Sequence, residues 1–199
     1  AEMNLLDGGT SVGGSITLAD ADGFVVNDGG TMKTIPATDV STYVGGGISE
    51  IDTWVYDDNE SISGGNGTLS SNWSREDDGG FDKLGTGMTE SSGIFTFPST
   101  GFWRVDGHIY FECGGARDRM GVQLHVTTDN SSYDLRTENS NSCSSNGHKI
   151  SAGTSAIIDV TNTTNVKVKM VYHASDSATL VGSSTVANTF MQFLRLGDT

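Results

Sequence analysis

Basic residues and long apolar runs are both scarce in this 199-residue chain. Only 11 residues are Lys or Arg, against 25 Asp and Glu, and the formal net charge is -14. Nucleic-acid binding needs clustered basic residues that neutralise phosphates, so a nucleic acid is not an expected partner. No apolar run approaches the roughly 20 residues that a membrane-spanning helix requires, so we expect no membrane insertion.

Proline and cysteine are also rare. The chain has 2 prolines and 2 cysteines but 27 glycines, and it lacks long segments rich in Leu, Ala, Glu and Lys. This composition favours short strands and turns over helices. Cys113 and Cys143 can form one disulfide or remain free thiols, and they do not make a usual four-ligand zinc site.

The common catalytic motifs are absent. The sequence contains no Gly-x-Ser-x-Gly, His-Glu-x-x-His, Cys-x-x-Cys or phosphate-binding loop motif. We therefore predict a protein that is not an enzyme and has no cofactor and no metal, although a depolymerase that cuts surface glycans remains an alternative. Acidic clusters at residues 57–60 and 76–78 are interpreted as a solvated rim, with calcium binding as the next alternative.

The segment 92–111 is the most informative part of the chain. It predicts two apolar strands around a turn that contains Pro98 and Gly101. In the second strand, one parity is apolar and is made by Trp103, Val105, Ile109 and Phe111. The other parity is polar and is made by Arg104, Asp106 and His108. This alternation is typical of a sheet with one face on a core and the other in solvent.

Further short strands are predicted between polar loops rich in Gly, Ser, Asn and Asp. They lie at residues 53–56, 120–128, 156–160, 166–172 and 186–196. Together they predict an all-β fold, a jelly-roll β-sandwich. The last strand is apolar on both parities, so we expect Met191 and Phe193 to lie in a trimer interface. Trp54 and Trp73 are expected to pack against a neighbouring subunit or the N-terminal segment rather than stack on a sugar.

The chain divides into a small N-terminal segment and a larger domain. Three consecutive glycines at 45–47 are the clearest hinge, so the predicted parts are residues 1–44, a hinge at 45–50 and a head domain at 51–199. The first part predicts a hairpin around residues 27–30 and a short helix after Pro36. It has too few apolar residues for a core of its own, so we expect identical neighbours to order it.

The larger domain resembles the globular jelly roll shared by the head of complement's first component and the tumour-necrosis-factor-like (TNF-like) family. The matching residues are Phe81, Asp82, Gly93, Phe95, Pro98, Gly101, Trp103, Val105 and the closing strand 189–196. The resemblance implies a homotrimer with the closing strands near its three-fold axis. The collagen stalk is missing, and no calcium or receptor motif of the family can be carried over to this sequence.

The N-terminal part resembles repeat modules of bacteriophage tail fibres and related virion appendages. The similarity rests on residues 1–8 and 27–35. It implies an intertwined fibre-shaft segment that attaches to other virion proteins and ends in a compact head. Together the two resemblances imply a virion structural protein, a tail-fibre tip whose head binds a host-surface glycan or protein.

Three polar segments of the head are predicted to be loops that contact the receptor, because rigid sandwiches commonly present binding groups on their connections. The first contains Arg117, Asp118 and Arg119. The second spans residues 133–148 and offers Tyr133, Arg136 and His148. The third spans residues 173–184.

Two other non-enzymatic functions remain open at this point. One is a capsid-decorating or head-fibre protein, which differs from a tail fibre only in its place in the virion. The other is a secreted adhesion module of a cellular organism. It is favoured by five glycosylation patterns, which begin at Asn59, Asn66, Asn72, Asn130 and Asn162. Because Ala1 is not an initiator Met, we expect the chain to be part of a longer protein.

Overall fold

The computed structural model describes residues 17–44, 47–75 and 83–199. The chain forms two compact units, Ala1–Gly47 and Ile48–Thr199. Three predictions fall outside the described residues: the fibre-like motif at 1–8, the acidic cluster at 76–78, and the Phe81 and Asp82 match. In the described part of the chain, no helix is both long and apolar enough to cross a membrane.

The described part of the first unit is a hairpin followed by a short helix. Strands β1 (Gly23–Asp28) and β2 (Thr31–Pro36) pair in antiparallel fashion, and α1 (Ala37–Tyr43) follows. The turn places Gly29 and Gly30 at positive φ, which glycine adopts without a steric cost. The predicted hairpin and short helix are thus confirmed. Each described side chain of residues 17–44 is exposed or half-buried, so this part has no core.

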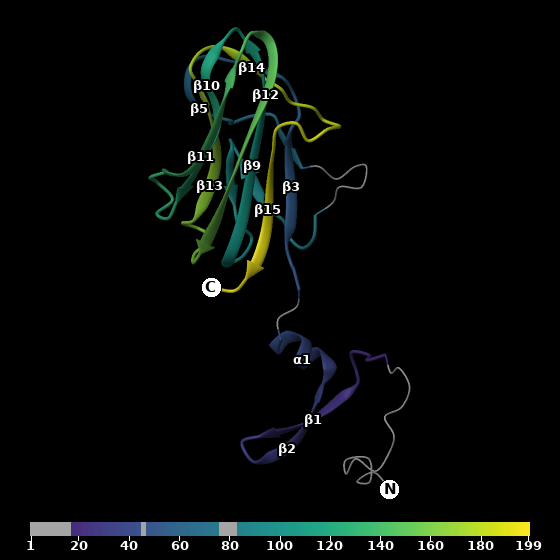
Figure 1. The fold of residues 1–199 in the computed structure, drawn as a ribbon. Coiled ribbons are helices and arrows are strands. Elements are labelled where there is room, and N and C mark those ends of the chain that lie inside the picture. Colours follow the sequence, from purple (N-terminus) through teal and green to yellow (C-terminus); the bar gives the residue numbers. More distant parts are fainter. Residues whose placement is uncertain (1–16, 45–46, 76–82) are drawn as a thin grey trace. The chain divides into compact units, whose positions relative to one another are not determined.

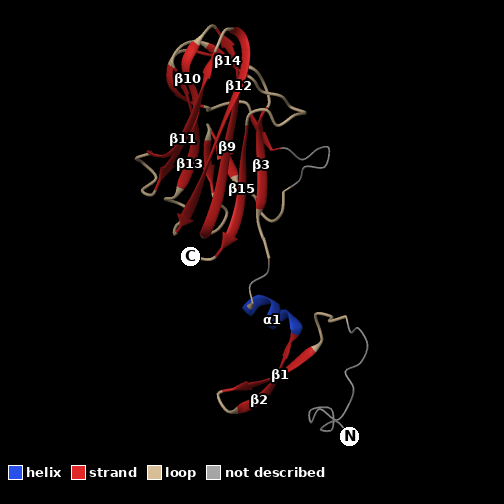
Figure 2. Ribbon diagram, in the orientation of Figure 1, coloured by secondary structure: helices blue, strands red, loops and turns tan. Residues whose placement is uncertain are grey.

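The second unit is a sandwich of two antiparallel sheets, and strands make up nearly all of its regular structure (Figure 1, Figure 2). The first sheet has the order β11-β10-β13-β8-β7, with β5 also beside β13. Its strands are β5 (Gly65–Thr68), β7 (Thr89–Ser91), β8 (Ile94–Thr96), β10 (Arg117–Thr127), β11 (Asp134–Cys143) and β13 (Lys167–Ala174).

The second sheet has the order β4-β14-β9-β15-β3-β6, and β12 pairs with the other edge of β9. Its strands are β3 (Ile51–Tyr56), β4 (Glu60–Ile62), β6 (Trp73–Arg75), β9 (Gly101–Gly114), β12 (Asn146–Val160), β14 (Ala178–Leu180) and β15 (Phe190–Gly197). The predicted all-β jelly-roll sandwich is confirmed.

The core lies between the two sheets, and β9 supplies its central face. Trp103, Val105, Ile109 and Phe111 are each at most 1% exposed, as their shared parity predicts. The facing sheet contributes Met120, Val122 and Leu124 from β10, together with residues of β13. Burial of such side chains is the main stabilising contribution to the head, at about 1.5–3 kcal/mol for each fully buried large side chain.

The closing strand β15 corrects one prediction. Met191 and Phe193 are both 0% exposed and lie in the core of their own chain, so their assignment to a trimer interface is wrong. The outward parity of β15 is the one that carries Phe190 and Leu194. Both parities are apolar in sequence, so the pattern alone did not show which one faces inward.

The two tryptophans near the start of the head pack within the chain. Trp54 and Trp73 meet the buried Phe95 edge-on, with ring centroids 5.6 and 5.3 Å apart. Their indole N–H groups donate to the carboxylate of Asp52 and to the carbonyl oxygen of Leu69. The structure therefore gives both residues a packing role inside one head. Both are half-buried, and their contact with a neighbouring subunit or the N-terminal segment stays a prediction.

Two predicted loops contain strands. Residues 133–148 include β11 and the beginning of β12, and residues 173–184 include β14. Strand β11 has no apolar alternation because its inward side chains are largely polar. Asn139 and Asn141 donate from their amides to the carbonyl oxygens of Gly153 and Ser151 on β12, at 2.9 and 2.8 Å. Side-chain hydrogen bonds thus join the two sheets along this edge, within a segment that was predicted to be a loop.

Cys113 and Cys143 form a disulfide that joins the ends of β9 and β11. Their Cα atoms lie 6.1 Å apart, and both residues are buried. Of the two states that the sequence left open, the structure has the bonded one. The disulfide ties the two sheets together at one end of the sandwich.

A buried carboxylate that accepts several hydrogen bonds lies toward the other end of the head. Asp52 is 1% exposed and accepts two hydrogen bonds from the Arg75 guanidinium, at 2.9 and 3.0 Å. It also accepts from the Trp54 indole at 2.9 Å and from the backbone N–H of Met88 at 2.7 Å. The Arg75 guanidinium carbon lies 4.6 Å from the Trp54 ring centroid. The negative charge is thus paired and hydrogen-bonded, as burial of a carboxylate requires.

Candidate functional site

The outer face of the first sheet carries a continuous chain of polar side chains along β10 and β11. The Arg119 guanidinium donates to Glu138 at 2.9 Å, and the Gln123 amide donates to the other carboxylate oxygen of Glu138 at 2.9 Å. The Gln123 carbonyl oxygen then accepts from Nε2 of His125 at 3.0 Å. We call these four residues the polar chain. Arg119 and Glu138 are exposed, whereas His125 is half-buried and Gln123 is buried.

A cation and an aromatic ring flank the His125 end of the polar chain. The Lys169 ammonium lies 4.6 Å from the Tyr133 ring centroid, and Lys169 is directly opposite His125 in the β10–β13 ladder. Burial, followed by the positive charge of Lys169, lowers the pKa of His125 below its ordinary 6.5. His125 is therefore neutral at pH 7, and its Nε2–H is fixed by the carbonyl oxygen of Gln123.

Of the six predicted receptor-binding residues, Arg119 lies at one end of the polar chain and Tyr133 lies near the other end, beside Lys169, so the structure does not bring these two together. Arg136 forms an exposed pair with Asp134 at 3.4 Å. His148 lies near the turn between β11 and β12, where its Nδ1 accepts from the backbone N–H of Ser144 at 3.1 Å.

The remaining two predicted residues are the first two residues of strand β10. Arg117 and Asp118 belong to the strand by their backbone, and their side chains lie outside what the structure describes. The expectation of a loop at residues 117–119 is therefore wrong, because pairing of Arg117 with Cys143 on β11 extends the strand to this point.

The outer face of the second sheet is apolar at several positions. Phe190 stacks on the imidazole of His108 with ring centroids 5.2 Å apart and an angle of 17° between the planes. Leu194 is half-buried on the same face, and Phe102 and Ile157 are 40% and 61% exposed. We call Phe102, Ile157, Phe190 and Leu194 the apolar face. The sequence analysis expected an apolar contact surface on the closing strand but assigned it to Met191 and Phe193, which are buried.

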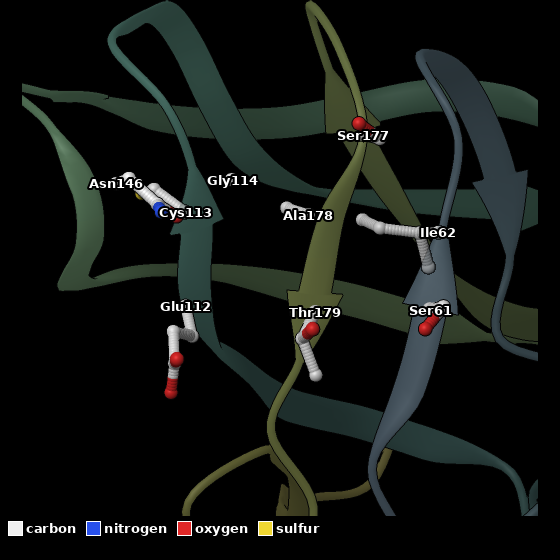
Figure 3. Close-up of a pocket in the computed structure, with 9 residues that line it drawn as sticks. All are labelled: Ser61, Ile62, Glu112, Cys113, Gly114, Asn146, Ser177, Ala178 and Thr179. Atoms are coloured by element: carbon white, nitrogen blue, oxygen red, sulfur yellow. The ribbon is translucent and has the colours of Figure 1, made fainter.

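A shallow pocket of about 270 Å³ lies where β4, β14 and β9 run side by side (Figure 3). Thr179 on β14 is directly opposite Glu112 on β9 and Ser61 on β4. Asn146 and Ser177 complete the polar part of its wall. Sequence reasoning did not single out these residues, because isolated Ser and Thr residues on three separate strands give no local signal.

Metal binding finds no support in the described residues: no three His, Cys, Asp or Glu side chains come together there as ligands. Within the acidic segment 57–60, Glu60 accepts a hydrogen bond from the Tyr56 hydroxyl. Burial and this neighbouring carboxylate raise the pKa of the Tyr56 hydroxyl, so tyrosine remains the proton donor. Glu60 thus acts within the head as a hydrogen-bond acceptor.

Comparison with known proteins identifies the fold. Neither a protein-family model nor a curated protein matches the sequence. The structure of Eiger TNF from S. frugiperda is similar, with a TM-score of 0.59 and 15% identity, over 77% of this chain and 95% of that chain. Murine APRIL at pH 5.0 has a TM-score of 0.55 and 15% identity, over 74% of this chain and 98% of that chain. The head therefore has the TNF-like jelly-roll fold, as its sequence resemblance implied.

Proposed function

We propose that this protein is a non-catalytic, homotrimeric receptor-binding protein that forms the tip of a phage tail fibre and lies on the outside of the virion. The observation that supports this proposal best is the apolar face on a TNF-like jelly roll. A solvent-facing sheet surface normally carries polar side chains, and a group of large apolar side chains on such a surface favours a contact with another molecule.

The apolar face has the composition of a contact between copies. Ile157 and Phe102 are the most exposed of its members, while the Phe190 ring is already ordered by its stack on His108. Arg104 and Asp106 pair at 3.0 Å on the same surface, where Arg104 lies on β9 between Ile157 on β12 and Leu194 on β15, so the apolar side chains flank a central ion pair. In a cyclic trimer each copy offers this surface to its neighbours. The contact between copies would therefore bury apolar side chains that a single head leaves exposed to solvent.

The receptor contact belongs on a surface that trimer formation leaves free. The polar chain lies on the outer face of the opposite sheet, so it stays accessible when the apolar face is covered. Arg119 can pair with a carboxylate or phosphate, and Tyr133 offers a ring for stacking on a host-surface glycan or protein. Three copies of a weak site gain strength through avidity.

The first unit supports a shaft role because its apolar side chains find no cover in the described residues 17–44. Val25 and Met32 on the hairpin are 56% and 63% exposed, and Tyr43 is 91% exposed. Three intertwined copies can bury such side chains against one another. In this proposal the segment also attaches the head to other virion proteins.

Native mass spectrometry of the full chain tests the trimer. We expect three times the chain mass of 20.9 kDa for the protein, and a monomer for Ile157→Asp, which places a charge on the apolar face. Val186→Asp is the matched control, because Val186 is 57% exposed but lies outside this face. A monomeric wild-type protein would refute the trimer.

Labelling of host cells tests the function. Fluorescent protein should bind susceptible bacteria and block infection by the parent phage, and Ile157→Asp should bind much more weakly because avidity is lost. Absence of binding to every susceptible host would exclude the receptor-binding role. Imaging of the particle with a specific antibody separates a tail-fibre tip from a capsid-decorating or head-fibre protein by its position.

A secreted adhesion or signalling module is the second candidate. Two observations favour it: similar solved structures include Eiger TNF and murine APRIL, and the head contains a disulfide, which is typical of oxidising compartments. This candidate predicts glycans at exposed acceptor sites such as Asn130. A mass decrease after glycosidase treatment of the native protein would support it over the phage proposal.

A further inference from the structure

The pocket of Figure 3 presents three polar side chains in one row. Thr179 is in register with Glu112 on one side and with Ser61 on the other. Residues directly opposite in an antiparallel ladder point to the same face. The next register position carries Cys113, Ala178 and Ile62, which are all buried in the core. The row therefore faces outward.

The polar groups of this row are available to a ligand. In the described part of the chain, the hydroxyls of Ser61 and Thr179 and the amide of Asn146 have no hydrogen-bond partner. The Glu112 carboxylate has one weak contact, 3.5 Å from the Lys149 ammonium, and both side chains are about half exposed. A hydroxyl or amide both donates and accepts, while a carboxylate accepts only. This set complements a molecule that carries several neighbouring hydroxyl groups.

The size of the pocket suits a small ligand. Its volume of about 270 Å³ lies just below the range of about 300–1,000 Å³ that is usual for small-molecule sites, which fits one sugar ring. No aromatic side chain lines it, so binding would depend on directed hydrogen bonds rather than on stacking. At one end of the pocket, a Cβ on Gly114 would lie 3.2 Å from the carbonyl oxygen of Ser177, so glycine allows the two backbones to approach closely there.

The floor of the pocket is rigid. Cys113 belongs to it and is tied by its disulfide to Cys143 on the opposite sheet. The β9–β14–β4 ladder holds the three strands in register. A preformed site loses little conformational entropy on binding, so a few hydrogen bonds suffice for a weak specific contact.

The position of the pocket fits a contact with a distant surface. The chain enters the second sheet at Ile51, opposite Leu194 and close to the C-terminus. Figure 1 shows β14 at the opposite end of the head from the C-terminus. The pocket lies on the outer face of the same sheet as the apolar face, but Glu112 is four residues farther along β9 than His108, which is about 13 Å at about 3.3 Å per residue. The pocket is therefore at the end of the head that is remote from the entry of the chain, beyond the residues of the proposed contact between copies.

We propose that this pocket binds a single neutral sugar residue of a surface glycan, with Thr179, Ser61 and Glu112 as its principal hydrogen-bonding residues. The proposal rests on the receptor-binding function proposed above and names the chemistry of one receptor contact. One head would bind weakly, and three heads on one fibre would raise the affinity through avidity.

Saturation-transfer NMR on the full chain tests the site. The probes are glucose, galactose, mannose, rhamnose and N-acetylglucosamine, each added separately. We expect transfer to at least one of them, and an at least tenfold weaker affinity for Thr179→Val and Glu112→Gln. Valine keeps the β-branched shape of threonine and removes only the hydroxyl. The matched control is Thr164→Val, an exposed threonine between β12 and β13, which should bind like the wild type.

The outcomes separate the site from the general function. If none of the five sugars receives transfer, or if a correctly folded Thr179→Val binds like the wild type, the sugar site is overturned. If cell labelling persists in that case, the receptor-binding function stands without this site. If sugar binding is lost in Thr179→Val while no host cell is labelled by the wild type, the site stands and the receptor-binding function fails.

Discussion

Substitution of Asp52 by Asn provides a sharp test of how the beginning of the head is held. The amide keeps nearly the same shape but removes the negative charge that two Arg75 nitrogens contact at 2.9 and 3.0 Å. It leaves a guanidinium that is 28% exposed without its counter-charge. Breaking a buried ion pair from one side costs about 3–5 kcal/mol, and the partial access of water to Arg75 places our expectation at about 3 kcal/mol.

Urea unfolding monitored by tryptophan fluorescence measures this loss, at one fixed protein concentration because the subunit association proposed above would add to the measured stability. Asp134→Asn is the control, since the Arg136–Asp134 pair is exposed on both sides and should be worth below about 1 kcal/mol. A double variant that also carries Arg75→Met should recover part of the loss, because no unpaired charge remains. A loss below about 1 kcal/mol for Asp52→Asn would refute the reasoning.

Three further predictions follow from the head. Replacement of Cys113 and Cys143 by Ser removes a disulfide between residues that are 30 positions apart in the chain. It should lower the free energy of unfolding by about 3–4 kcal/mol in urea titrations, and an unchanged unfolding midpoint would contradict this stabilising role. In an NMR titration, His125 should protonate below pH 6.5. The stability that its neutral form contributes is therefore present above pH 6.5 and is lost as the pH falls through the lowered pKa. Lys169→Gln should raise the pKa of His125, and an unchanged pKa would exclude an effect of the Lys169 charge. Gly93→Ala should destabilise the head by about 2 kcal/mol or more in thermal unfolding, because φ at Gly93 is +79° and the new Cβ would lie 2.1 Å from the backbone oxygen of Leu69. If the variant is as stable as the wild type, the turn relaxes to accommodate the methyl group.

The fold class was predictable because alternation is a local signal. In β9 every second residue is apolar, and the strand spans the whole width of the core, so four residues suffice to identify its inner face. The hairpin before Pro36 was predictable for a similar reason, since adjacent strands joined by a glycine turn need no information from distant residues.

The polar strand β11 was not predictable in this way. Its inward residues Asn139 and Asn141 hydrogen-bond to the carbonyl oxygens of β12 instead of entering an apolar core. A strand whose two faces are both polar has no period-2 pattern. Part of the candidate receptor surface was missed for the same reason, because Glu138 on β11 joins Arg119 to Gln123 only once β10 and β11 are paired.

By itself, the amino-acid order determined an all-β head with its core face on residues 103–111 and a small N-terminal part without a core. Only the tertiary structure decided that Phe193 points inward and Phe190 outward, that the two cysteines bond, and that Ser61, Glu112 and Thr179 form one row. The physical reason is register: a shift of one residue turns every side chain of a strand to the other face, and register between strands far apart in the chain is set by the packing of the whole sandwich.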